Sequence, residues 1–362
     1  MFLISHFKKL DWIMIVSALL LAGFGLLSIY SSSFGDNDFS DFKKQIIFLG
    51  IGVFFLFLLS FFDWRAIRDN SYFILIFYFL CLLALAGLLF FAPVIRGVKG
   101  WYKIGPVSFD PIELTKIVLI ILLAKYFSKR HIEMYKLKHI LLSGFYVLLP
   151  AFLIFRQPDL GSALILIILW VGVLVISGIK LRHFLILILC SLLVSVIAWS
   201  FLLKDYQRER IVSFFAPEME PLGISWSQNQ AKIAIGSGGI LGQGFGRGSQ
   251  TRYGFLPEPR TDFIFASIAE EFGLAGVSVL LLLFLVIIWR IMKIAINAKS
   301  NFPRLFVSGF VIVLISQAFI HIGMNLGILP VIGISLPLVS YGGSGLIATF
   351  VSFGILQSIK FQ

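Results

Sequence analysis

Ten apolar segments of membrane-spanning length dominate the sequence. A spanning helix needs about 20 mainly apolar residues, and ten stretches come near that length. They cover residues 11–31, 46–62, 72–92, 112–127, 139–155, 160–178, 184–203, 264–289, 305–325 and 341–359. Only 13% of the residues are charged, whereas about a quarter are charged in soluble domains. We therefore predict an all-α polytopic membrane protein with about ten transmembrane helices, forming one domain over residues 1–362.

The loops between these segments are short, except for residues 204–263 between the seventh and eighth helices. If the N-terminus lies inside, the inner segments carry Lys8, Lys9, Arg65, Arg68, Lys129, Arg130, Lys136, Lys138, Lys180, Arg182, Arg290, Lys293, Lys299, Arg304 and Lys360. The short outer loops then carry Lys43, Lys44, Arg96, Lys99, Lys103 and Arg156. The positive-inside rule therefore predicts cytoplasmic termini, an external long loop and a multi-pass protein of the cytoplasmic membrane.

The net charge of +12 is explained by this basic inner girdle, which would lie beside anionic membrane lipid. We therefore expect no nucleic-acid partner. Both cysteines, Cys81 and Cys190, lie in apolar segments, so the sequence predicts no disulfide framework. It contains no metal-binding cluster of cysteine and histidine.

Polar and charged residues at the ends of the apolar segments gather on the predicted outer side. A charge at the centre of a spanning helix costs about 2.5–3.5 kcal/mol, so such residues need a function or a partner. The group comprises Glu113, Lys116, Asp159, Asp262, Asn325 and the segment SYGGSG at 340–345. A reaction outside the cell has no ATP, so its substrate must arrive already activated. An activated substrate anchored in lipid would meet this demand and would also lie beside the polar residues at the outer membrane boundary.

The glycine-rich stretch GSGGILGQGFGRGS, residues 236–249, does not predict a nucleotide site. It lacks the Gly-Lys-Ser/Thr ending of a P-loop and the spacing of a dinucleotide turn. We interpret it as a close-packing loop and expect no nucleotide cofactor. The preceding ISWSQNQAKIAIG could form a short amphipathic helix in the membrane interface.

Four ordered stretches resemble one family along most of the chain: YQRERIVSFFAPE, SWSQNQAKIAIGSGGILGQGFGRGSQ, FLPEPRTDFIFASIAEEFG and GMNLGILPVIGISLPLVSYGGSG. They resemble the SEDS proteins (shape, elongation, division and sporulation), and the RodA-type members most closely. One motif departs from the family pattern. The usual Gln-Pro-Ser-Glu at the start of the fourth helix is here DPIE, with Asp110 and Ile112 replacing Gln and Ser.

The resemblance implies a peptidoglycan glycosyltransferase that polymerises lipid II during cell elongation and releases undecaprenyl pyrophosphate. It assigns the catalytic carboxylate to the aspartate of a Thr-Asp-Phe motif, here Asp262. It also implies lipid II and the growing lipid-linked glycan as substrates and a class B penicillin-binding protein as partner. Lys, Arg or a divalent cation, Mg²⁺ or Mn²⁺, would balance the pyrophosphate charge.

Candidate substrate-binding residues are Trp101, Glu113, Lys116, Asp159, Arg208, Arg210, Lys232, Arg260, Ser340 and Ser344, and candidate support residues are Glu270, Glu271 and Asn325. Structural alternatives stay open for several of them. Asp262 and Asp159 suit helix caps, Glu113 and Lys116 lie on one helix face and could form a structural ion pair, and SYGGSG could let two backbones approach. Arg208 and Arg210 could lie on a solvated loop face.

Two other functions stay open from the sequence. A lipid II flippase would also have many helices and intramembrane charges, but its polar residues should follow a path through the membrane. A non-enzymatic scaffold of the cell-wall synthesis complex would not require an aspartate at position 262. The concentration of polar residues on one side favours the glycosyltransferase.

Overall fold

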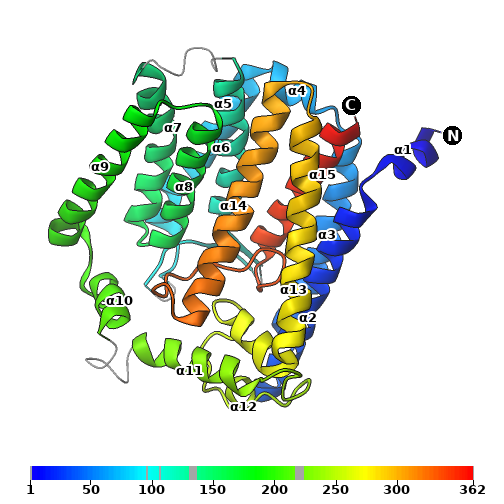
Figure 1. Ribbon diagram of the computed structural model, residues 1–362, viewed down its shortest axis with the longest axis vertical. Coiled ribbons are helices and arrows are strands. Elements are labelled where there is room, and N and C mark those ends of the chain that lie inside the picture. The colour runs from blue at the N-terminus through cyan, green and yellow to red at the C-terminus, as the bar shows by residue number, and fades with distance from the viewer. Residues whose placement is uncertain (1, 95–96, 106, 130–136, 217–223, 362) are drawn as a thin grey trace.

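The computed structural model describes residues 2–94, 97–105, 107–129, 137–216 and 224–361 of a helical bundle (Figure 1). Arg96, Arg130 and Lys136, which entered the orientation argument, lie outside these residues. Ten long helices correspond to the ten predicted segments, which confirms the all-α polytopic fold. They are α2 (Trp12–Asp36), α3 (Ser40–Ser60), α5 (Ser71–Phe91), α6 (Pro111–Ser128), α7 (Leu137–Arg156), α8 (Leu160–Ile176), α9 (Leu181–Ile197), α13 (Ile264–Asn297), α14 (Asn301–Leu326) and α15 (Gly343–Phe361).

Within the described ranges, eight of these helices are long and apolar enough to cross a membrane. The other two are α8, which is shorter, and α6, which carries Glu113, Lys116 and Lys125. Several predicted boundaries differ from the observed ones by a few residues, and two of the differences bear on the site or on the orientation argument. Helix α3 begins at Ser40, so Lys43 and Lys44 lie in a helix instead of a loop. Helix α13 extends to Asn297 and contains a break at Gly273 that the apolar pattern did not reveal.

Shorter elements connect the long helices. They are α1 (Phe2–Lys9), α4 (Trp64–Asp69), the two-stranded hairpin of β1 (Tyr102–Ile104) and β2 (Val107–Phe109), the π-helical turn η2 (Ala198–Leu202), α10 (Asp205–Phe215), α11 (Ile224–Ser237) and α12 (Ser249–Arg252). The predicted short helix before the glycine-rich stretch is α11. Residues 204–263 are therefore partly helical, and α10 to α12 lie at one end of the bundle (Figure 1).

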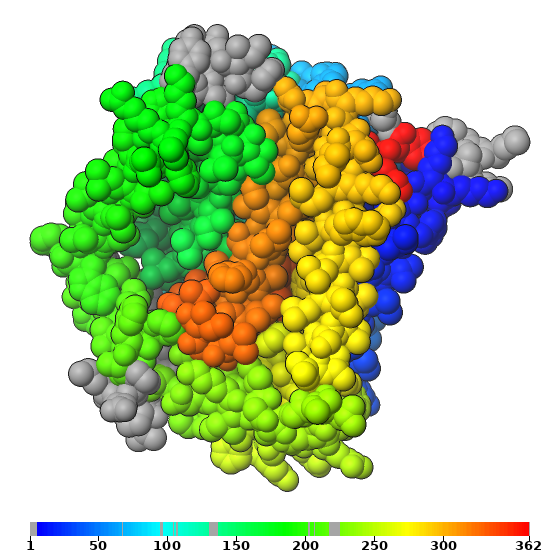
Figure 2. Space-filling model, viewed as in Figure 1, coloured from blue at the N-terminus to red at the C-terminus, as the bar shows by residue number. Residues whose placement is uncertain are grey.

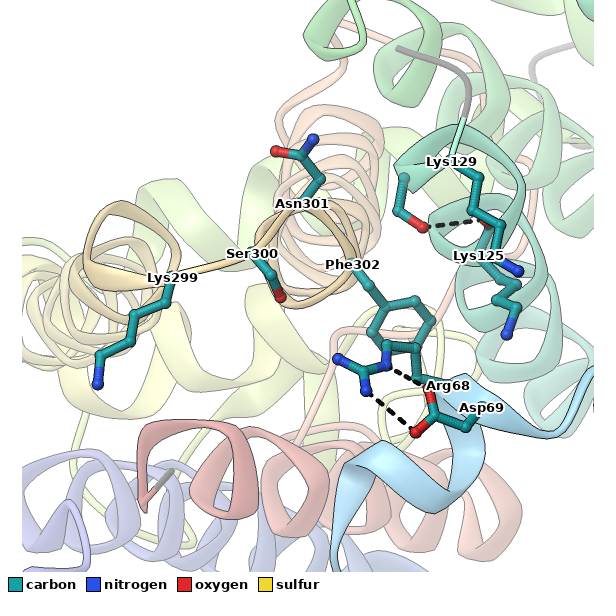
Figure 3. A pocket seen from close by; sticks show the side chains of 9 residues that line it. Arg68, Asp69, Lys125, Lys129, Lys299, Ser300, Asn301 and Phe302 are labelled. Atoms are coloured by element: carbon teal, nitrogen blue, oxygen red, sulfur yellow. Dashed lines mark hydrogen bonds and ion pairs between the residues drawn. The ribbon is translucent and has the colours of Figure 1, made fainter.

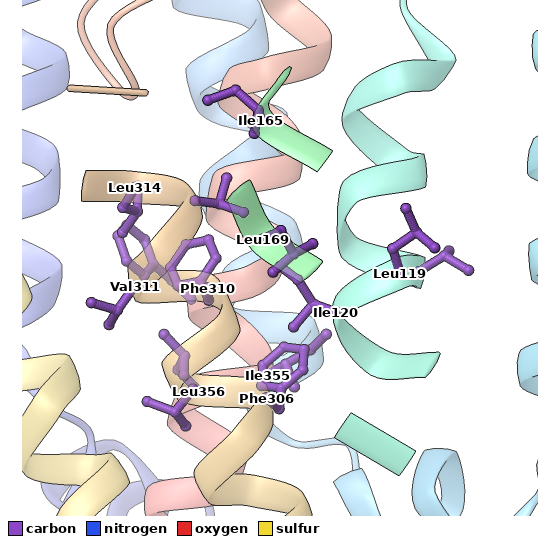
Figure 4. Close-up of a cluster of buried hydrophobic side chains, with 14 of the residues drawn as sticks. Leu119, Ile120, Ile165, Leu169, Phe306, Phe310, Val311, Leu314, Ile355 and Leu356 are labelled. Carbon is purple, nitrogen blue, oxygen red and sulfur yellow. The ribbon is translucent and has the colours of Figure 1, made fainter. Parts of the chain in front are cut away.

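The core forms where α6, α8, α14 and α15 meet. Helix α14 packs against α6, α8 and α13, and it is the most buried of the eight helices that are long and apolar enough to cross a membrane. Figure 4 shows Phe306 and Phe310 of α14 among Leu119, Ile120 and Leu169 from α6 and α8. Helix α15 packs mainly on α3, and α13 packs on α2. The core thus joins the first, middle and last thirds of the chain.

Helix α9 stands apart from this core. None of its residues is buried, and after Arg182 and His183 in its first turn its side chains are almost all apolar. It continues through η2 into α10, and α10 packs against α11. Figure 2 shows a hollow between the green α9–α10 segment and the orange α14. A helix that is apolar and exposed all round is suited to lipid contact.

The chain termini lie at the end of the bundle opposite α11 and α12 (Figure 1), and a buried ion pair joins three helices there. Asp11, which caps α2 through the Met14 N–H, is 2% exposed. Arg290 of α13 and Lys360 of α15 approach its carboxylate at 2.6 and 3.2 Å. Burial alone would raise the pKa of Asp11, but the bonds from Arg290 and Met14 and the charge of Lys360 together lower it.

We expect Asp11→Asn to lower the thermal unfolding temperature in detergent. The free energy of unfolding should fall by about 2 kcal/mol at pH 7, because hydrogen bonds to a charged group are removed. A carboxylate whose folded pKa is lowered stabilises the fold above its unfolded pKa, about 3.9, and this contribution is lost as pH falls through the folded value. The difference between the wild type and Asp11→Asn should therefore shrink below about pH 4. Asp63→Asn, at the exposed cap of α4, is the control and should change little; an equal effect of both variants would contradict the prediction.

Candidate functional site

The segment of residues 260–263 before α13 carries Asp262, and we call it the Asp262 loop. Asn325 of α14 holds the backbone of this loop in place. The Asn325 side-chain NH₂ donates to the Asp262 carbonyl at 3.0 Å and to the His321 carbonyl at 2.8 Å. Its Oδ1 accepts the Ala266 N–H at 3.2 Å. Ala266 belongs to the first turn of α13, whose N–H groups lack helical partners. Asn325 is fully buried, so one amide both caps α13 and holds the backbone at Asp262.

The segment SYGGSG binds the same loop from the other side. Ser340 Oγ donates to the Thr261 carbonyl at 2.8 Å and accepts the Leu336 N–H at 2.9 Å. The next residue, Tyr341, donates its backbone N–H to the Arg260 carbonyl at 2.8 Å. Ser340 is buried, and its hydroxyl bonds to backbone groups. Ser340 therefore stabilises the conformation of the Asp262 loop.

Arg260 anchors this loop to the turn between α2 and α3. Its guanidinium lies 2.9 Å from Asp41 and 3.2 Å from Asp36, and it also donates to Ser32 Oγ at 3.3 Å. Planar guanidinium groups suit several simultaneous acceptors. Because two carboxylates share its charge, Arg260 fits a role in holding the loop better than one in binding a pyrophosphate.

Asp262 itself is partly exposed and does not occupy the cap position of α13. The N-cap is Phe263, without a side-chain capping bond, and Asn325 supplies an acceptor from another helix. Gly333 faces the carboxylate, because a Cβ at this position would lie 3.7 Å from Asp262 Oδ2. The helix-cap alternative for Asp262 is therefore not what the structure contains.

A second polar group forms where α6, α8 and α15 begin. Lys116 Nζ and Glu113 Oε1 are 2.6 Å apart, and Lys116 is buried. Ser344 Oγ accepts the Asp110 N–H at 2.9 Å, and Gly345 lies beside the Glu113 carboxylate. Asp159 caps α8 by accepting the Ser162 N–H at 2.9 Å. The structure thus contains the ion pair and the Asp159 cap that the sequence left as alternatives.

Asp110 belongs to this second group and was missed as a candidate, because it attracted notice only as a departure from the family motif. Its side chain caps α6 by accepting the Ile112 N–H at 2.9 Å. Burial raises the pKa of both Asp110 and Asp159, and the charge of Glu113 acts in the same direction. The sequence signal was present: an aspartate followed by proline is a common start of a helix.

The glycine-rich stretch fits into the break of α13. At Gly273 the backbone has φ 62° and ψ −164°, a region open essentially only to glycine. The break exposes backbone groups that the loop then satisfies. Gln243 and Gly244 donate to the carbonyls of Glu270 and Glu271 at 2.9 and 3.0 Å, and Leu274 donates to Gly239 at 2.9 Å. This confirms a close-packing loop.

The two glutamates before the break have structural partners. Glu270 accepts the N–H groups of Gln250 at 2.7 Å and Thr251 at 3.1 Å, and so caps the short helix α12. Glu271 accepts a hydrogen bond from Ser31 of α2. Both glutamates are buried. Their contacts agree with the support role expected from the sequence.

Four other candidates lie on elements outside the Asp262 loop. Arg208 and Arg210 are on α10, where Arg208 donates to the Ser200 carbonyl at 3.3 Å. Lys232 is on α11 with its ammonium against Gly327 at the end of α14, where a cation is favoured by the helix dipole. Trp101 is partly buried just before β1. Within the described residues, no hydrogen bond or ion pair joins Arg208 or Lys232 to Asp262.

In the described part of the chain, no group of three or more His, Cys, Asp or Glu side chains could hold a metal ion. Asp110, Glu113 and Asp159 lie near one another, but the Glu113 carboxylate already forms an ion pair with Lys116. These residues therefore do not fit a protein-held metal.

Comparison with known proteins identifies the family. A family model described as "Cell cycle protein", for the FtsW, RodA and SpoVE proteins, matches residues 11–362. The chain belongs to the FtsW/RodA/SpoVE family. It is 35% identical over 350 residues to the peptidoglycan glycosyltransferase MrdB of Escherichia coli (strain K12), with 97% of this chain and 93% of the relative covered. It is 33% identical to stage V sporulation protein E of Bacillus subtilis (strain 168), with 97% and 96% covered.

Solved structures agree with this membership in the FtsW/RodA/SpoVE family. A chain from a peptidoglycan synthase complex that coordinates polymerization and crosslinking superposes with a TM-score of 0.83 at 31% identity, covering 97% of this chain and 98% of that chain. The rod shape determining protein RodA of Thermus thermophilus superposes with a TM-score of 0.70 at 28% identity, with 97% of each chain covered. The resemblance stated from the sequence is confirmed.

We expect Gly273→Ala to destabilise this family member strongly. A Cβ at Gly273 would collide with the backbone of Ile240 and Gly242, and alanine cannot adopt the required φ and ψ without strain. The unfolding temperature should fall, and limited proteolysis should cut residues 238–248 faster. Gly236→Ala is the control, because a Cβ there meets nothing within 4 Å and alanine favours its helix by about 0.5–1 kcal/mol. Equal protection of the loop in both variants would contradict the prediction.

Proposed function

We propose that this protein is a peptidoglycan glycosyltransferase that polymerises lipid II at the outer face of the cytoplasmic membrane. The single observation that carries the proposal is the loop of Asp262, which Asn325, Ser340 and Arg260 fix from three sides of the bundle. A reactive side chain must be held close to its productive geometry by its supports. The likeness to the glycosyltransferase MrdB supplies the reaction class.

In the proposed reaction, the 4-hydroxyl of the acceptor sugar attacks the anomeric carbon of the donor. Asp262 takes the hydroxyl proton, the new β-1,4 bond forms with inversion, and undecaprenyl pyrophosphate leaves. A positioned general base contributes about 10²–10⁴-fold to the rate. Asp262 is partly exposed, and Gly333 opposite it has no side chain. The two features leave room for a sugar hydroxyl at the Asp262 carboxylate.

The leaving pyrophosphate needs positive charge, and the candidates differ in how engaged they are. Arg260 is shared by Asp36 and Asp41, and Lys116 is paired with Glu113. Lys232 is exposed on α11. Arg208 belongs to α10, the helix that borders the hollow in Figure 2, and its only ion pair in the described residues is a long one of 4.0 Å to the exposed Asp205. We therefore assign pyrophosphate binding first to Lys232 and Arg208. A divalent cation, Mg²⁺ or Mn²⁺, would enter with the pyrophosphate, because Mg²⁺ is usually bound through substrate phosphates.

The proposed orientation places both termini in the cytoplasm and the Asp262 loop outside. The termini share one end of the bundle, and α10, α11 and α12 lie at the other (Figure 1). The basic side chains Arg68, Lys129, Arg290 and Lys299 lie at the terminal end, as the positive-inside rule requires for a cytoplasmic face. The partner would be a class B penicillin-binding protein, in line with the similar chain from a peptidoglycan synthase complex.

The decisive experiment compares Asp262→Asn with wild type, alone and with its penicillin-binding partner, on fluorescent lipid II resolved on a gel. Asparagine preserves the shape and removes the base, so polymerisation should fall at least about 100-fold. Asp38→Asn, an exposed carboxylate at the same end, should keep activity. Full activity of Asp262→Asn would remove the proposed base. Absence of polymer from the wild type under every partner and cation condition would favour lipid II transport, and a vesicle flipping assay would follow.

We expect Asn325→Ala to act through position alone. It removes the bonds to the Asp262 carbonyl and the Ala266 N–H, and small displacements of a reacting group can cost about 100-fold in rate. The maximal rate of polymerisation should fall while the lipid II concentration for half-maximal rate changes little. Ser316→Ala is the control on the same helix, since its hydroxyl donates to Ile312 of α14. A change confined to the half-maximal concentration would instead indicate substrate contact.

A further inference from the structure

A basic cavity lies at the end of the bundle opposite the Asp262 loop, and the proposed reaction makes no use of it. Helix α4, the end of α6 and the turn between α13 and α14 surround it (Figure 3). Its volume is about 450 Å³, within the range of about 300–1,000 Å³ of small-molecule sites. The cavity is therefore large enough for a lipid headgroup.

Positive charge dominates the lining. Four basic residues, Arg68, Lys125, Lys129 and Lys299, line the cavity together with a single carboxylate, Asp69. Arg68 binds that carboxylate with two bonds, of 2.6 and 3.0 Å. The Arg68 bond, followed by the charges of Arg68, Lys125 and Lys129, lowers the pKa of Asp69. Because Arg68 already satisfies Asp69, the three lysines leave the cavity with excess positive charge.

The walls of the cavity are well defined. Trp64 of α4 stacks on Phe302 of α14 with ring centroids 5.7 Å apart and an angle of 7°. Arg68 lies over the Trp64 ring at 5.2 Å, which holds the guanidinium in place. Helix α14 starts here, and its N-cap Ser300 makes no side-chain capping bond. The N-terminus of this long helix adds to the positive potential that the lysines create.

We propose that this cavity binds the phosphate of an anionic phospholipid headgroup, such as that of phosphatidylglycerol. The surroundings favour a lipid over a soluble phosphate. Helix α5 packs against both α4 and α6 and exposes apolar side chains, among them Phe73, Ile76 and Leu80. Acyl chains could lie along this surface while the headgroup enters the cavity. Basic pockets between spanning helices on the cytoplasmic side are typical sites for such headgroups.

The test uses the full-length protein, stripped of lipid in detergent, with retained lipid counted by native mass spectrometry. Dioleoyl phosphatidylglycerol, dioleoyl phosphatidylcholine and inorganic phosphate are titrated separately. The wild type should retain one phosphatidylglycerol at low lipid concentration and no phosphatidylcholine. Lys125→Gln/Lys129→Gln should weaken this retention about thirtyfold, the loss expected for two lysines near an anionic surface.

Lys8→Gln/Lys138→Gln is the matched control, because it removes two exposed lysines from the same end without touching the cavity. It should retain phosphatidylglycerol like the wild type. Equal weakening in both double variants would mean a diffuse basic girdle and would overturn the proposal. So would displacement of the lipid by millimolar inorganic phosphate, which would indicate a soluble phosphorylated ligand. Unchanged unfolding temperatures of both variants without lipid verify that the cavity variant is folded, and Lys129→Gln alone replaces it if it is not.

Discussion

A backbone N–H or C=O without a partner in the apolar part of a membrane costs several kcal/mol, and this constraint shapes the whole protein. The spanning helices satisfy it internally. The chain departs from helix at two important places, the Asp262 loop and the break at Gly273. At both, side chains or loops from distant parts of the sequence supply the missing hydrogen bonds. The non-helical backbone near the site is therefore held as firmly as the helices that surround it.

This arrangement separates residues that hold the loop from residues that can meet a substrate. Asn325, Ser340 and Arg260 direct their polar atoms at backbone or at carboxylates of the protein. Asp262 keeps partial access to solvent. The chemistry thus needs few groups, while their support recruits α2, α3, α14 and the start of α15.

Apolar length and charge were enough to predict the ten helices and to gather the polar residues at one end. The fold class followed from the same pattern of apolar segments. The close-packing role of the glycine-rich stretch followed from its glycine content and from the lack of a nucleotide-binding motif. Patterns could not reveal that Asn325 caps α13 from another helix, or that Arg260 is occupied by Asp36 and Asp41. Those contacts join residues more than fifty positions apart in the sequence. The break at Gly273 was hidden inside an apolar run, because hydropathy does not record φ.

The way the glycine-rich loop fits into α13 has a consequence for synthesis in the cell. Residues 239–244 leave the ribosome before Gly273, yet their hydrogen-bond partners are the backbone groups on either side of it. The loop cannot reach its final form until the eighth spanning helix has been inserted. The first seven long helices are therefore synthesised before this loop has its partners, and the site is complete only when the last third of the chain is present.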